Sequence, residues 1–173
     1  MADRDDADLE DARPPPAALR RRRARRPRDV REAAVALLAR RDYSRSELER
    51  RLGSQGYSPE DVAALIGEFI ETRALDDTRF AQNYVSYHAG RGQGPLRIQA
   101  DLEARGVAAG LIEAALAEGP DWHALAREQC RRRFGAEAPA GRREQVRQAR
   151  FLQSRGFSSD HIRAALGADF DAD

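Results

Sequence analysis

The stretch "LQSRGFSSDHIRAAL", residues 152–166, decides the fold, because a close copy of it lies fifty residues earlier in the chain. That copy, "LEARGVAAGLIEAAL" at residues 102–116, is identical at seven of the fifteen aligned positions. A weaker third copy, "LGSQGYSPEDVAALI", occupies residues 52–66, so Gly56, Gly106 and Gly156 recur at one fixed spacing. A period of this length is typical of proteins that are built from tandem repeats.

Each repeat glycine has the sequence context of a helix end. Gly106 follows Leu102 by four residues and precedes Val107, and the other two copies have the same arrangement. Glycine adopts a positive φ without strain, and the apolar residue after it folds back onto the helix that has just ended. The pattern therefore predicts a helix, a glycine turn and a second helix, three times over.

Helix signals fill the chain from residue 29 onward. "SRSE" at 44–47 is a capping box, and "SPED" at 58–61 places serine at the N-cap with proline after it. No segment alternates in the manner of a strand. We expect an all-α chain of three tandem three-helix repeats in an elongated, curved array, covering residues 29–73, 74–118 and 119–168, with neighbouring units sharing core.

The two ends of the sequence differ from this pattern. Residues 1–12 hold six acidic residues and one arginine, whereas residues 13–28 hold eight arginines and no acid. Segments with so few apolar residues cannot offset the entropy of ordering the chain, so we expect residues 1–28 to form a disordered tail. Residues 169–173 form a short acidic C-terminal end.

Composition excludes several classes of protein. The chain of 173 residues has a net charge of +1, contains no lysine and has a single cysteine, Cys130, which excludes an internal disulfide and a cysteine-based zinc site. No apolar run approaches the ~18 residues that a membrane-spanning helix needs. We expect a soluble cytoplasmic protein without a membrane partner. Because every basic residue is arginine, as codon bias would produce, only the clustering of arginine is informative.

Catalytic motifs are absent from the sequence. There is no phosphate-binding glycine loop, no zinc-protease motif and no nucleophile elbow, and no histidine has a second histidine or a cysteine at helical spacing. We predict no catalytic residue, no cofactor and no metal site. A sequence-specific, DNA-binding helix-turn-helix protein is a weaker interpretation. Residues 59–72 and 108–118 offer acidic and alanine side chains where base contacts need Arg, Asn or Gln.

Arginines gather instead on the helices that precede the glycines. Residues 127–155 carry nine arginines against three glutamates, a local net charge of +6. Such a run is either a solvated helical face or an electropositive surface for phosphates or an acidic protein groove. The candidate binding residues are Arg97, Arg131, Arg132, Arg133, Arg142, Arg143, Arg147, Arg150 and Arg155.

Three blocks of the sequence resemble the RecX family. They are "LARRDYSRSELERRLGSQGYS" (38–58), "ALDDTRFAQNYVSYHAGRGQGPLRIQADLEARGV" (74–107) and "FLQSRGFSSDHIRAAL" (151–166), in the family's order and at family-like spacing. The middle block is the most distinctive, with an acidic pair, then R-F-A, then G-x-G-P-x-R-I. The family-motif residues to which the resemblance gives a structural role are Asp76, Asp77, Phe80, Gly94, Pro95, Gly56, Gly106 and Gly156.

The resemblance implies a function that composition and periodicity do not. RecX proteins are small cytoplasmic bacterial regulators of the RecA recombinase, built from tandem three-helix repeats. A member is expected to bind along the groove of the RecA–single-stranded-DNA filament as a monomer, and to inhibit recombinase, ATPase and co-protease activities, thereby regulating homologous recombination, DNA repair and the SOS response. Binding to single- and double-stranded DNA is expected to be weak and largely non-specific. The alternative is a helical nucleic-acid-binding module without a recombinase partner.

Overall fold

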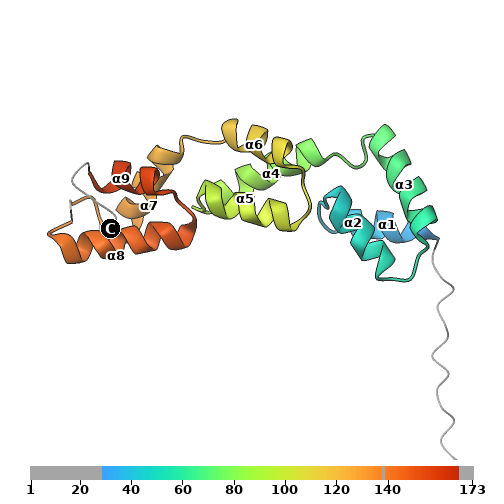
Figure 1. The fold of residues 1–173 in the computed structure, drawn as a ribbon, viewed down its shortest axis with the longest axis horizontal. Helices are drawn as coiled ribbons and strands as arrows, with labels where there is room; N and C mark the ends of the chain where they lie inside the picture. The colour runs from blue at the N-terminus through green and yellow to red at the C-terminus, as the bar shows by residue number, and fades with distance from the viewer. Residues whose placement is uncertain (1–28, 138, 168–173) are drawn as a thin grey trace, which may run out of the picture.

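Three groups of three helices follow one another in an elongated array (Figure 1). The computed structural model describes residues 29–137 and 139–167, and within them every regular element is an α-helix. The predicted tail at 1–28 and acidic end at 169–173 lie outside the described residues. The helices are α1 (Val30–Leu38), α2 (Arg45–Gly53), α3 (Pro59–Glu71), α4 (Asp77–Gly90), α5 (Pro95–Ala104), α6 (Ala109–Ala117), α7 (Trp122–Phe134), α8 (Arg142–Arg155) and α9 (Ser159–Leu166). The expected all-α chain of three-helix repeats is confirmed.

Side chains of polar residues cap the starts of α2 and α4. Ser44 caps α2 by accepting a hydrogen bond from the Glu47 backbone N–H at 3.1 Å, and the Glu47 carboxylate accepts from the Ser44 backbone N–H. Asp76, the first of the acidic pair, caps α4 through the backbone N–H groups of Thr78 and Arg79. These side chains satisfy backbone donors that have no partner inside the helix.

The repeat glycines have the left-handed backbone that the sequence predicts. Gly56, Gly106 and Gly156 have φ values of +91°, +75° and +88°. After the turn, Val107 and Phe157 fold back and are buried, which starts the next helix on the core side of its unit. The helix–glycine turn–helix reading is therefore confirmed in all three units.

Each unit has a core of its own. Leu48, Leu52 and Ile66 are at most 1% exposed in the first unit. Phe80, from the R-F-A motif, is buried with Ile98 and Leu102 in the second unit, and Leu152 and Ile162 are buried in the third. Among the described residues only Leu125 packs against two of these clusters, the second and the third. The expected sharing of core is confirmed at the second junction, where Trp122 and Leu125 of the third unit pack against the core of the second. The first cluster has no described residue in common with the second.

The middle helices of the three units lie end to end. At the second junction, the Gly94 backbone N–H at the start of α5 donates to the Arg155 carbonyl at the end of α8 at 2.8 Å, and the Leu96 N–H donates to the Gly156 carbonyl at 3.0 Å. A Cβ on Gly94 would lie 2.4 Å from the Gly156 carbonyl carbon, so the two backbones touch. Pro95 occupies the first position of α5, where a missing N–H costs nothing.

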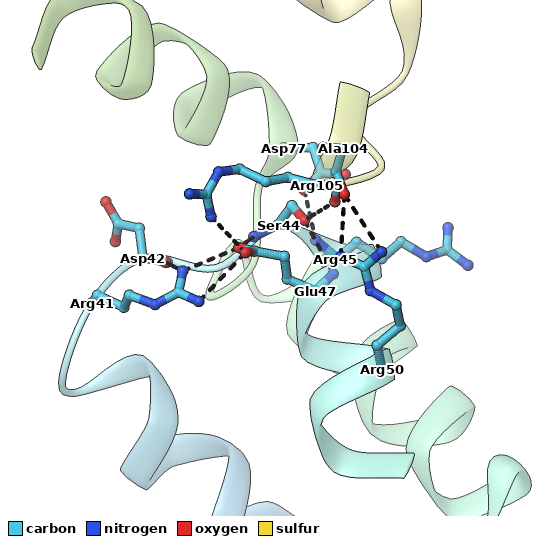
Figure 2. Close-up of polar contacts among 9 residues, drawn as sticks. All are labelled: Arg41, Asp42, Ser44, Arg45, Glu47, Arg50, Asp77, Ala104 and Arg105. Carbon is cyan, nitrogen blue, oxygen red and sulfur yellow. Dashed lines mark hydrogen bonds and ion pairs between the residues drawn. The ribbon is translucent and has the colours of Figure 1, made fainter. Parts of the chain in front are cut away.

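At the first junction, between the first and second units, side chains join the helix ends (Figure 2). The Ser44 hydroxyl donates to the Arg105 carbonyl at 2.6 Å, at the point where α2 begins and α5 ends. Glu47, whose side chain is only 11% exposed, pairs with Arg105 at 2.5 Å and with Arg41 at 3.1 Å. The second residue of the acidic pair, Asp77, accepts from the Arg45 backbone N–H at 2.8 Å and so links α4 to α2.

Candidate functional site

An exposed row of arginines lines the first half of α8. We call Arg142, Arg143, Arg147 and Arg150 the arginine face of α8. They surround an open hollow of about 1070 Å³ whose other lining residues are Ala140, Gly141, Glu144 and Val146. The helix repeat places positions 143, 147 and 150 on one side, because residues three and four apart are neighbours on a helix surface. The predicted clustering of these arginines is thus a geometric property of one helix.

Most guanidinium groups of the arginine face have no acidic partner within the part of the chain that the structure describes. Arg147 pairs with Glu144 at 3.2 Å. No carboxylate of residues 29–137 or 139–167 lies within ion-pair distance of Arg142, Arg143 or Arg150. Each guanidinium presents five N–H donors in a fixed fork that matches a phosphate or a carboxylate. The face is therefore equipped to bind anionic groups in pairs of hydrogen bonds.

The three arginines at the end of α7 differ in whether they form an ion pair. Arg131 and Arg132 both bind the Glu128 carboxylate, the latter at 2.7 Å. The hydrogen bond from Arg132, followed by the charge of Arg131, lowers the pKa of Glu128 despite its partial desolvation. Arg133 is exposed and lies 5.9 Å from the centre of the Phe134 ring. Arg133 is accordingly the arginine of this triplet that has no ion-pair partner among the described residues.

Two aromatic rings position the arginines where α7 meets α8. Phe134 and Phe151 pack edge to face with their ring centres 5.4 Å apart. The Arg147 guanidinium lies 5.1 Å from the centre of the Phe134 ring, and that of Arg155 lies 5.3 Å from Phe151. A cation over an aromatic face is attracted by the ring quadrupole. The rings hold these two side chains in place without neutralising their charge.

Two of the predicted binding residues also have a structural role that the sequence does not indicate. The Arg97 guanidinium donates to the Ser154 carbonyl at 3.3 Å, and that of Arg155 donates to the Arg91 carbonyl at 3.3 Å. Both hydrogen bonds cross the second junction. Arg97 and Arg155 therefore help to join the second and third units, and they lie at the opposite end of α8 from Arg142.

A histidine pair connects the starts of α7 and α9. His123 Nε2 lies 2.9 Å from an Asp160 carboxylate oxygen, and its ring packs edge to face on His161 at 4.7 Å. Burial, and then the charge of His123, lowers the pKa of His161, whose Nδ1 accepts a hydrogen bond from the Ser158 backbone N–H. No group of His, Cys, Asp or Glu among the described residues could hold a metal ion.

Known proteins share both the sequence pattern and the fold. Three models of the RecX family match the chain: the first three-helix domain at residues 31–69, the second at 76–116 and the third at 121–166. The chain belongs to the RecX family. The regulatory protein RecX of Halorhodospira halophila is 48% identical over 140 residues, covering 80% of this chain and 87% of that protein. That of Chromohalobacter salexigens is 45% identical over 139 residues, covering 79% of this chain and 90% of that protein.

A solved structure supports the fold. RecX from Lactobacillus salivarius aligns with a TM-score of 0.68 and 23% sequence identity, over 79% of this chain and 94% of that one. This chain is thus a RecX-type regulatory protein by sequence and has the RecX fold. No helix among the described residues is both long and apolar enough to span a membrane.

Proposed function

We propose that this chain binds the RecA–single-stranded-DNA filament and inhibits its recombinase, ATPase and co-protease activities, so regulating DNA repair in the cytoplasm without catalysis of its own. The resemblance to RecX, a family named for regulatory proteins, supports the choice of partner. The observation that carries the binding proposal is the arginine face of α8, where three exposed guanidinium groups have no carboxylate partner among the described residues.

The elongated array suits a partner that is itself a filament. Three cores in a row, joined end to end through α2, α5 and α8, present a surface much longer than one compact unit (Figure 1). A monomer of this shape reaches more than one protomer of a helical groove. In this arrangement the arginine face supplies attraction to exposed DNA phosphates or to recombinase carboxylates, and contacts to phosphates are independent of base sequence.

Titration of the protein into the DNA-dependent ATPase reaction of its cognate RecA tests this function. We expect the rate of ATP hydrolysis to fall as the protein is added, and fluorescence anisotropy to show tighter binding to assembled filament than to bare single-stranded DNA. Equal binding to both, with an unchanged ATPase rate, would overturn the proposal and favour the nucleic-acid-binding module without a recombinase partner.

A charge-matched pair of variants tests the site within that function. The face variant carries Arg143→Ala, Arg147→Ala and Arg150→Ala. The control variant carries Arg40→Ala, Arg51→Ala and Arg79→Ala, which removes the same charge from exposed positions of the first two units. We expect the face variant to inhibit the ATPase less than the control variant does. Equal loss in both would show that net charge matters and that the face is not a binding site.

A further inference from the structure

The third unit places the start of α8 and the end of α9 at the same end of the molecule. α9 packs on α8 and runs back along it, so α9 ends toward the end of the unit where α8 begins (Figure 1). Val146 near the start of α8 and Leu166 at the end of α9 both pack against the same core cluster. Gly167, the last described residue, therefore lies at the end of the unit at which the arginine face begins.

The sequence that follows carries the charge that the arginine face lacks. Residues 168–173 read "ADFDAD", with carboxylates at Asp169, Asp171 and Asp173 and no basic residue. The arginine face has three guanidinium groups without a carboxylate partner among the described residues. The first of these carboxylates comes two residues after Gly167, and α9 ends at the same end of the unit at which α8 begins.

The length of the acidic segment and the spacing of its aspartates match the dimensions of the arginine face. The chain from residue 167 to residue 173 reaches about 20 Å when extended, whereas positions 142 to 150 span about 12 Å along α8. In an extended segment alternate residues share one side, so the three aspartates would be spaced by about 7 Å. Positions 143, 147 and 150, which share one side of α8 and of which Arg147 also pairs with Glu144, are separated by about 6 and 4.5 Å of helix rise. Three carboxylates of this segment can therefore meet three arginines of this face.

We propose that the acidic segment 169–173 docks on the arginine face of α8 and competes there with external anions. Exposed ion pairs are individually weak and are screened by salt. Tethering compensates, because a short linker holds the segment at an effective concentration in the millimolar range. The contact is therefore partial, is present at low ionic strength, and yields to a ligand with more negative charges.

Another acidic stretch of the chain is a poorer occupant. Residues 3–11 hold six acidic residues, but in the sequence they precede the first unit. That unit lies at the other end of the array from α8 (Figure 1). Eight arginines at 13–28 lie between that stretch and the fold and compete for the same carboxylates. Proximity and the absence of intervening positive charge both favour 169–173.

Paramagnetic relaxation in the full-length chain tests the contact. A nitroxide label at Ala172→Cys, in a Cys130→Ala background, should broaden the amide signals of residues 142–150 at 20 mM salt (about a tenth of physiological ionic strength), where screening is weak. The broadening should fall in the face variant and persist in the control variant, both confirmed as folded by their remaining amide signals. A label at Ala7→Cys reports on the competing acidic stretch, and a mixture of labelled and isotope-enriched chains reports on contact between two copies.

The pattern of broadening shows whether the acidic segment contacts the arginine face. Broadening from position 172 within one chain, lost in the face variant, supports the contact. Absence of broadening at low salt, equal broadening in the face variant, stronger broadening from position 7, or broadening only between chains would overturn it.

Docking of the acidic segment should also weaken the binding of external anions. This inference rests on the proposed function only for the identity of the natural partner, so a single-stranded DNA without RecA tests it independently of RecA inhibition. The affinity for a thirty-nucleotide oligothymidylate should rise about fivefold at low salt when Asp169, Asp171 and Asp173 are changed to Asn. This increase in affinity should vanish at 300 mM salt. Unchanged binding would overturn the competition. If the contact and the gain are both found while the RecA ATPase is unaffected by the protein, the proposed function fails and this inference stands.

Discussion

Changing Gly156 to alanine probes the junction between the second and third units directly. Gly156 has φ of +88°, and a Cβ built on it would lie 2.4 Å from the Arg97 Cβ and 2.6 Å from the Arg97 backbone nitrogen. Gly56, the equivalent residue of the first unit, has φ of +91° but nothing within 4 Å of its Cβ position. The two substitutions therefore share the backbone strain and differ only in the junction.

The magnitude follows from that difference. A non-glycine residue in the left-handed region costs about 1–2 kcal/mol, which is the whole expected effect of Gly56→Ala. At Gly156 the neighbouring α5 backbone must also move, which weakens the hydrogen bonds from Gly94 to Arg155 and from Leu96 to Gly156. Each net hydrogen bond is worth about 1 kcal/mol, so Gly156→Ala should lower the free energy of unfolding by about 3–4 kcal/mol.

Urea denaturation followed by helical circular dichroism measures both values. With a slope of about 2 kcal/mol per molar urea, the midpoint should fall by about 0.5–1 M for Gly56→Ala and by about 1.5–2 M for Gly156→Ala. Equal midpoints for the two variants would refute the reasoning, because they would show that the close approach of α5 and α8 contributes nothing beyond the glycine conformation.

Three further predictions concern charge. The face variant should bind single-stranded DNA, alone or in the filament, with a logarithmic salt slope shallower by about 2, since each lost phosphate contact removes about 0.7; an unchanged slope in anisotropy titrations would place the contacts elsewhere. Arg105→Ala should destabilise the chain by about 2 kcal/mol in urea titrations, because it leaves the mostly buried Glu47 with Arg41 alone, whereas a similar loss in the exposed Arg51→Ala would contradict this. Burial lowers the pKa of His161 below its ordinary value of 6.5, so the unfolded chain binds more protons and stability should fall as pH drops through 6.5; His161→Gln, which keeps the capping box, should flatten that dependence in urea midpoints measured from pH 7.5 to 5.5.

The sequence by itself determined the features that depend on neighbouring residues along the chain. The turn at Gly156 and the capping box of Ser44 and Glu47 rest on interactions within about four residues, and both have the predicted form. The N-cap at Asp76 is equally local. The crowding of arginines on α8 is equally local, since the helix repeat alone places positions 143, 147 and 150 together.

Only the tertiary structure decided how the units are joined and which charges remain available. Ser44 meets Arg105 across 61 positions, and Arg97 meets Ser154 across 57. No periodicity signals such pairs, because helix ends can be satisfied by side chains, backbone or water, and the choice depends on where another unit's helix end comes to lie. The position of the neighbouring unit also decides which arginines are engaged. The Arg155 guanidinium binds a carbonyl across the junction, whereas Arg143 and Arg150 have no carboxylate partner among the described residues.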